Sequence, residues 1–452
     1  MSAAIGTGEG LGWLGIFRLG LVQTALGAIV VLTTSAINRV MVVELALPAT
    51  LPGVLVAVHY AVQILRPRMG YGSDMGGQRT PWIIGGMAVL AIGGIGAAAA
   101  TALMASAPTL GLMLAIAAFL LIGIGVGAAG TSLLVLLAAV VAERRRPAAA
   151  SIVWIMMIAG FVVTTAIAGR LLDPYSGQRL IVVASGVSAL AFLLAVIAVW
   201  GIEARQVPLR NALVQAGPRT PFRQALGEVW AEPDSRRFTV FVFVSMLAYS
   251  AQDLVLEPFA GQVFGLSLGE TTSLASIQHG GVLAGMIVIA MVGIFASRTR
   301  FGTMRGWTIG GCAAATLAML MLVVASQVGP GWPLGASFFV LGLANGVFAA
   351  AAIASMMLMV GKGRERREGV RMGMWGAAQA IAFGLGSLAG AVALDLARLA
   401  LAETASAYAA VFLADALLFG IAGLLALRIG AWQRRSAVTF GTFPPGKQAV
   451  GG

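Results

Sequence analysis

The lysine and arginine residues of this chain are concentrated in alternate connections between long apolar stretches. About twelve stretches are long and apolar enough to cross a bilayer as helices, for which roughly 20 residues suffice. Their approximate bounds are 18–37, 46–65, 82–103, 109–141, 149–172, 180–201, 237–256, 271–296, 306–326, 333–360, 370–395 and 408–428. If the amino terminus is cytoplasmic, all but four of the 29 lysines and arginines lie on the cytoplasmic side, the four being Arg39, Arg170, Arg179 and Arg398. The positive-inside rule therefore predicts a multi-pass protein of the cytoplasmic membrane with both termini in the cytoplasm.

This topology also explains the formal net charge of +12. In a soluble chain such a charge would favour nucleic-acid binding, but here the cations follow the loops that stay in the cytoplasm. We therefore expect membrane lipid, and no nucleic acid, among the partners. The single cysteine, Cys312, excludes an intrachain disulfide.

The chain contains an internal repeat of six predicted helices. The fourth and tenth spans align without a gap, and the matched pairs are Phe119 with Phe338, Gly123 with Gly342, Gly127 with Gly346, Val141 with Val360 and Arg145 with Arg364. The fifth and eleventh spans also correspond, because Trp154 precedes Asp173 by 19 residues and Trp375 precedes Asp395 by 20. Such repeats are common in membrane carriers.

We predict four segments from this repeat and from the distribution of polar residues. Residues 1–203 form an amino-terminal six-helix half, and residues 237–430 form a carboxy-terminal one. Residues 204–236 form a cytoplasmic linker with a short amphipathic helix, and residues 431–452 form a disordered cytoplasmic tail.

A polar loop after the second span resembles the cytoplasmic signature of the major facilitator superfamily. The residues that match are Gly70, Asp74, Gly77 and Arg79. The loop departs from the signature at Met75 and Gln78, where the family usually has basic residues, and this difference puts strict transporter-type gating in question. Together with the spans and the repeat, the loop predicts an all-α integral membrane protein with the major facilitator fold.

Two histidines at membrane depth are candidate ligands. His59 lies in the second span, with Gln63 one turn further on the same helix face, and His279 lies in the eighth span. Polar groups inside a membrane are costly, so function is the default hypothesis. Either histidine could be the axial ligand of a chlorin magnesium, or could be hydrogen-bonded between helices.

Two pairs of charged residues occupy matching positions in the halves. Arg39 and Glu44 bracket the predicted hairpin between the first two spans, and Asp253 and Glu257 end the seventh span at i and i+4 on one helix face. These acids could gate a cavity, carry a proton, or anchor the helices at the interface. The sequence shows no phosphate-binding loop, zinc-ligand cluster or nucleophile–base pair, and we expect no enzyme.

Several longer runs make the chain similar to the bacteriochlorophyll delivery family of the major facilitator superfamily. The similar runs are Leu11 to Gln23, Asn38 to Leu45, His59-Tyr60 through Arg66-Pro67-Arg68, and Gly70 to Trp82. Within that family, the short amino terminus and the stretch from Arg66 to Trp82 favour the bacteriochlorophyll synthase chain branch.

The resemblance implies a membrane factor of purple phototrophic bacteria that binds or delivers bacteriochlorophyll and supports assembly of light-harvesting complexes. Bacteriochlorophyll would be its bound pigment, and light-harvesting polypeptides or the pigment synthase would be its protein partners. Two other functions stay open. One is a pigment-free assembly scaffold for those partners, and the other is a proton-coupled transporter of a small solute.

Overall fold

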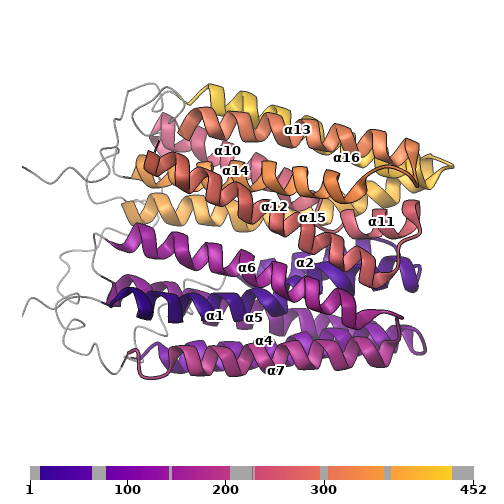
Figure 1. Cartoon of the computed structure of the whole chain (residues 1–452), viewed down its shortest axis with the longest axis horizontal. Helices are drawn as coiled ribbons and strands as arrows, with labels where there is room; N and C mark the ends of the chain where they lie inside the picture. Colours follow the sequence, from indigo (N-terminus) through magenta and orange to yellow (C-terminus); the bar gives the residue numbers. More distant parts are fainter. Residues whose placement is uncertain are drawn as a thin grey trace, which may run out of the picture.

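The computed structural model describes residues 11–63, 78–141, 145–203, 227, 230–295, 304–360 and 368–429. The described chain is built of helices, which run side by side in one bundle (Figure 1). In chain order they are α1 (Trp13–Leu32), η1 (Thr33–Ile37), η2 (Val40–Glu44), α2 (Thr50–Val62), α4 (Thr80–Met104), α5 (Pro108–Val140), α6 (Arg146–Leu172), α7 (Gly177–Val199), α10 (Pro233–Ala251), α11 (Leu256–Phe264), α12 (Leu268–Phe295), α13 (Met304–Val328), α14 (Leu334–Val360), α15 (Glu368–Ala400) and α16 (Thr404–Leu427).

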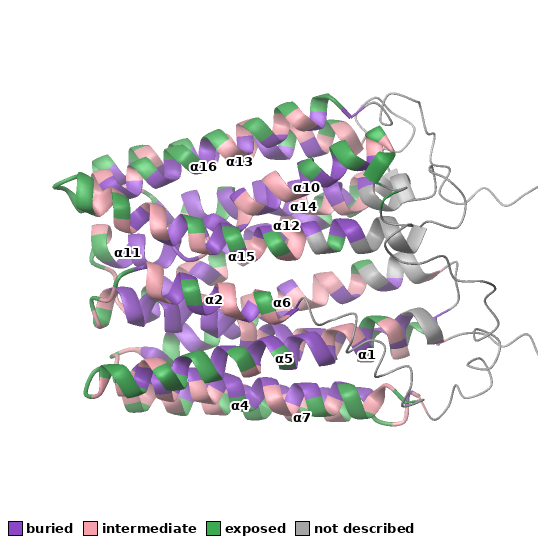
Figure 2. Ribbon diagram, turned by 180° about the vertical axis from the view of Figure 1, so that it is seen from behind, coloured by how far each residue is buried: buried purple, intermediate pink, exposed green. Residues whose placement is uncertain are grey.

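The surface of the bundle is suited to lipid. Within the described residues, eleven helical stretches are long and apolar enough to cross a membrane, and α2 is a shorter apolar helix. Large apolar side chains such as Leu190, Ile197 and Leu399 are exposed on the outside of the bundle, where Figure 2 shows many exposed residues. A surface of this kind would promote aggregation in water but is satisfied by acyl chains. The chain is therefore a multi-pass membrane protein.

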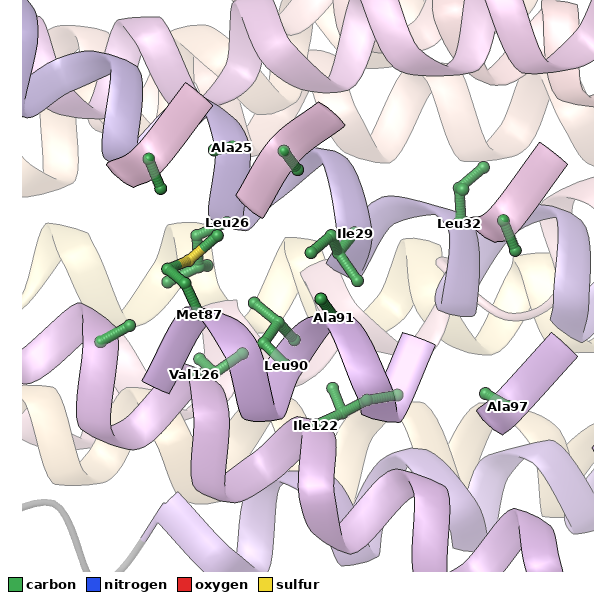
Figure 3. Packing of buried hydrophobic residues seen from close by; sticks show 14 of the residues in the cluster. Ala25, Leu26, Ile29, Leu32, Met87, Leu90, Ala91, Ala97, Ile122 and Val126 are labelled. Carbon is green, nitrogen blue, oxygen red and sulfur yellow. The ribbon is translucent and has the colours of Figure 1, made fainter. Parts of the chain in front are cut away.

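Each half of the chain has its own apolar core. One cluster is built almost entirely from α1 to α7, and Figure 3 shows part of it, where Leu26 of α1 lies beside Met87 of α4. A second cluster is built mainly from α10 to α16. A third, smaller cluster joins the halves through α6, α12 and α14. The group from α10 to α16 lies above the group from α1 to α7 in Figure 1.

Successive long helices begin at alternate ends of the bundle. We call the end at which α1, α4 and α6 begin the arginine-rich end, because the sequence places the arginine-rich loops next to it. The end at which α2, α5 and α7 begin is called the opposite end.

Glycine allows close helix contact where α12 crosses α14. A Cβ atom at Gly342 would lie within 2.8 Å of the backbone carbonyl carbon of Gln278, and one at Gly285 would lie 2.5 Å from the carbonyl oxygen of Leu343. Small residues three to four positions apart let transmembrane helices approach in this way. The contact fixes the backbone of α12 just before His279, one of the two candidate ligands.

Most predicted spans agree with the helices, and two were too short. The first was predicted to end at residue 37 and the seventh at residue 256, but the helical stretches continue to Glu44 and Phe264. The physical reason is that Arg39, Glu44 and Glu257 lower the local hydropathy, although Arg39 and Glu257 are buried among neighbouring helices. The predicted tail 431–452 and most of the linker 204–236 lie outside the described residues.

Candidate functional site

The cytoplasmic loop motif is described only at its end. Gly70, Asp74 and Gly77 lie outside the described residues, whereas Arg79 caps the beginning of α4. The backbone N–H groups of Arg79 and Thr80 donate to the carboxylate of Glu203, at distances of 2.8 to 2.9 Å. Carboxylates at helix N-termini are stabilising because they pair with free N–H groups and with the helix dipole. Glu203 therefore ties the beginning of α4 to the segment that follows α7.

His59 is buried in α2 and is already engaged. Its Nε2 lies 2.9 Å from the side-chain nitrogen of Gln63, and the two residues share one helix face, as their i, i+4 spacing predicted. An amide nitrogen can only donate, so the lone pair of His59 Nε2 accepts this bond. The ring also meets the edge of Tyr60, which stacks on Phe383 of α15 with centroids 5.6 Å apart. His59 therefore belongs to a contact between the two halves.

His279 in α12 is held by a hydrogen bond to its own helix. Its Nδ1 lies 2.7 Å from the carbonyl oxygen of Ala275. A carbonyl oxygen can only accept, so Nδ1 carries the proton and Nε2 keeps its lone pair. Among the described residues, nothing hydrogen-bonds to Nε2. A histidine that donates one ring N–H to a backbone carbonyl is held in one orientation, with its other nitrogen ready for a metal.

The surroundings of His279 are apolar and come from both halves. The ring of Phe161, on α6, meets the imidazole edge-on with centroids 5.1 Å apart. Towards the arginine-rich end lies the third core cluster, which consists of Ile158, Val282 and Met286 with Trp154, Ile155, Met157, Phe161, Leu283 and Ala350 around them. We call this group with His279 the His279 site. Its aromatic and thioether side chains suit a flat, polarisable ligand.

Arg39, which was predicted to bracket a hairpin between the first two spans, lies inside the protein. It lies between the two π-helical segments η1 and η2, with 2% of its surface exposed. Its guanidinium forms an ion pair with Glu44 and donates to the carbonyl oxygen of Leu266 at 2.8 Å. The predicted hairpin position was wrong because the helix continues through both charged residues.

Asp253 and Glu257 do not share one helix face, contrary to the prediction. The helix breaks between them, because α10 ends at Ala251 and α11 begins at Leu256. Glu257 is buried near Arg39, whose charge acts on it, and accepts a bond of 3.5 Å from the hydroxyl of Thr272. Asp253 lies in the turn itself.

The irregular part of the first span meets the break in the seventh. The side-chain amide of Asn38 donates to the carbonyl oxygen of Leu254 at 2.9 Å, and both groups are buried. A broken transmembrane helix frees backbone groups that polar side chains must satisfy. The structure therefore gathers Arg39, Glu44 and Glu257 into one polar cluster, the Arg39 cluster, between the halves. His59 and His279 are not part of it.

Two aspartates that the repeat revealed, but that we did not predict as site residues, connect the halves at the opposite end. The carboxylate of Asp173, at the end of α6, accepts bonds from the hydroxyl of Ser267 and from the N–H of Gly269, at the beginning of α12. Asp395, near the end of α15, accepts bonds from the N–H groups of Ala49 and Thr50, at the beginning of α2. We call these the paired aspartate caps.

The paired aspartate caps follow the pseudo-symmetry of the chain. Asp173 reaches from the first half to the second, and Asp395 reaches from the second half to the first. Nearby, Tyr175 lies outside the spans, and burial together with the charge of Glu44 raises the pKa of its phenol. At this end, therefore, the halves are joined by reciprocal charge-assisted contacts.

Comparison with solved structures identifies the fold. A bacterial homologue of the human lysosomal transporter Spinster, in an inward-facing and unoccupied conformation, matches with a TM-score of 0.65 at 15% identity, over 92% of this chain and 96% of that one. The peptide transporter POT in complex with alafosfalin gives 0.64 at 15% identity, over 94% and 98% of the two chains. The protein has the major facilitator fold, as predicted.

Comparison of sequences gives the family. The profile of the PUCC protein family matches residues 36–433. The bacteriochlorophyll synthase 44.5 kDa chain of Rhodobacter capsulatus is 51% identical over 421 residues, which are 93% of this chain and 96% of that protein. Protein PucC of the same organism is 30% identical, over 83% of each chain. The similarity inferred from the sequence is confirmed, and the chain belongs to the PucC family.

Proposed function

We propose that this protein binds bacteriochlorophyll at the His279 site and delivers it during assembly of light-harvesting complexes in a purple phototrophic bacterium. The observation that carries the proposal is the free lone pair of His279 Nε2 beside apolar walls from both halves. A relative that shares half of its residues with this chain is named a bacteriochlorophyll synthase chain, which supports a pigment of this class.

The residues at the His279 site fit a magnesium chlorin. Magnesium free of a ring prefers oxygen ligands, but a chlorin supplies four nitrogens and leaves an axial position for an imidazole. The Ala275 carbonyl holds the imidazole of His279 in one orientation, and Phe161 packs against its edge. Trp154, Met157 and Met286 offer contact area for an apolar macrocycle.

We also propose that the chain carries pigment and does not catalyse its synthesis. The groups described at the His279 site are one imidazole and apolar side chains, with the Gln23 amide donating to the sulfur of Met157 at 3.2 Å, and these can bind and orient a ring. A carrier of this kind would shield a molecule too apolar for an aqueous route. We place the arginine-rich end in the cytoplasm, with both termini, on the basis of the charge asymmetry.

The test is the absorption spectrum of protein purified in mild detergent from pigment-producing cells. Wild type should show the bands of a magnesium chlorin, and His279→Ala should lose at least about 90% of them, because an axial ligand is lost. His59→Ala is the matched control and should keep them, since the His59 Nε2 lone pair already accepts from Gln63.

Other outcomes would favour the alternatives. Colourless wild-type protein that co-purifies with light-harvesting polypeptides or the pigment synthase would support the scaffold and contradict pigment binding. Equal loss of pigment in both histidine variants would contradict the role of His279. A proton-coupled transporter is favoured by one observation, the buried acid Glu257 between the halves, and it predicts solute uptake that Glu257→Gln abolishes and that responds to a pH gradient.

A further inference from the structure

Asp415 of α16 points into the second half of the protein and not towards lipid. It is 2% exposed, and its Oδ2 has no hydrogen-bond partner among the described residues. Tyr408, Phe412 and Phe419 are buried on the same helix face, so a carboxylate interrupts an otherwise aromatic stripe. A charged group inside a membrane protein is costly and marks a site more often than a packing position.

Aromatic contacts show which helices lie near Phe419, one turn beyond Asp415 on α16. The ring of Phe419 meets that of Phe348, on α14, and Phe348 meets Phe241, on α10, both with centroids 6.2 Å apart. The helices α14 and α16 run in the same direction, from the opposite end towards the arginine-rich end. One turn back along each, Asn345 and Asp415 take the places of Phe348 and Phe419.

Asn345 is the second polar group of this layer. It is 0% exposed, and neither atom of its amide has a hydrogen-bond partner among the described residues. One turn further along, the rings of Phe348 and Phe419 meet between α14 and α16, whereas the shorter side chains of Asn345 and Asp415 do not bond each other. The ring of Phe412 on α16 also meets the ring of Phe259 on α11, with centroids 4.9 Å apart.

Asp415 and Asp253, the latter in the break of the seventh span, are two acids whose burial disfavours the charged form of each. Neither acid has a salt bridge to a lysine or arginine among the described residues. Two acids in an apolar region repel each other when ionised, so both are destabilised unless a positive charge lies between or beside them.

We propose that Asp415 and Asn345 form a binding site for a small monovalent cation, sodium in the first instance. A carboxylate and an amide oxygen are hard donors of the kind that alkali and alkaline-earth ions prefer. The layer itself holds one carboxylate, which one monovalent charge balances, and water completes the coordination. This site lies inside the second half and is separate from the His279 site.

Thermal unfolding of the purified full-length protein tests the proposal. The melting temperature of wild type should rise by about 3 °C between sodium-free buffer and saturating sodium, with choline chloride keeping the ionic strength constant. Asp415→Asn and Asn345→Leu should each abolish this rise. Glu403→Gln changes an exposed acid of the same segment and should leave the rise intact.

Each other result contradicts the site. A wild-type melting temperature that does not depend on sodium would mean that water or a proton satisfies Asp415. A rise that persists in Asp415→Asn would place the cation elsewhere. If Asp415→Asn does not fold, Asn345→Leu decides the same question. It leaves the carboxylate in place and removes only the amide oxygen that would bind the cation.

Discussion

Arg39 shows how one side chain can join the halves of a membrane protein. Its guanidinium bonds Glu44 on its own segment and the carbonyl of Leu266 in the other half. We expect Arg39→Gln to lower the free energy of unfolding by about 2 to 3 kcal/mol, because Glu44 and Glu257 lose a buried counter-charge. Thermal or denaturant unfolding in detergent measures the effect.

A matched control separates this effect from the loss of any arginine. Arg237 forms an ion pair with Asp234 in which both side chains are about half exposed. Arg237→Gln should therefore change stability by less than about 0.5 kcal/mol. Similar losses in both variants would contradict the role that we assign to Arg39.

For single residues, the sequence predicted which side chains contact each other better than it predicted how deeply they are buried. The contact between His59 and Gln63 followed from their spacing, since residues four apart on a helix are neighbours. The burial of Arg39 did not follow, because hydropathy reads a charge as the end of a span whether or not other helices enclose it. The difference between the two histidines depends on one proton position, which the Ala275 carbonyl sets.

Among the helices, the paired aspartate caps are the contacts that close the opposite end. Replacing Asp173 and Asp395 with alanine removes two charge-assisted contacts from each cap, which are worth about 1.5 to 3 kcal/mol apiece. We expect the double variant to open at this end, so that a cysteine at Ser273 becomes reactive. Ser273 faces Gly169 of α6, where a Cβ would lie 2.6 Å from its hydroxyl oxygen.

The measurement is the rate of labelling by a water-soluble maleimide in a Cys312→Ser background, which removes the only native thiol. The rate should rise at least about tenfold in the double variant. Glu403→Gln, an exposed acid at the same end, should leave it unchanged. An unchanged rate in the double variant would show that packing alone closes this end.

Helix positions could be predicted from hydropathy, and their exceptions have one cause. The first and seventh spans were predicted too short, and both continue into irregular segments that carry polar residues. Comparison of the two halves did find Asp173 and Asp395, but three of their four partners are backbone N–H groups, which no residue type marks. That part of the site needed the structure.

For the molecule as a whole, the charge asymmetry predicts the orientation in the membrane. In the Cys312→Ser background, Glu403→Cys at the opposite end should react with an impermeant maleimide in intact cells. Arg236→Cys, which is exposed at the arginine-rich end, should react only after the membrane is opened. The reverse pattern would show that the protein has the opposite orientation in the membrane, and it would contradict the assignment of both termini to the cytoplasm.

The reciprocal arrangement of Asp173 and Asp395 has a mechanical consequence. A rocking motion that separates the two halves at the opposite end must break both caps in the same movement. Their free energies then add, so the two factors by which they disfavour the open form multiply. The separation should therefore be all-or-none, with neither cap able to act as an independent hinge.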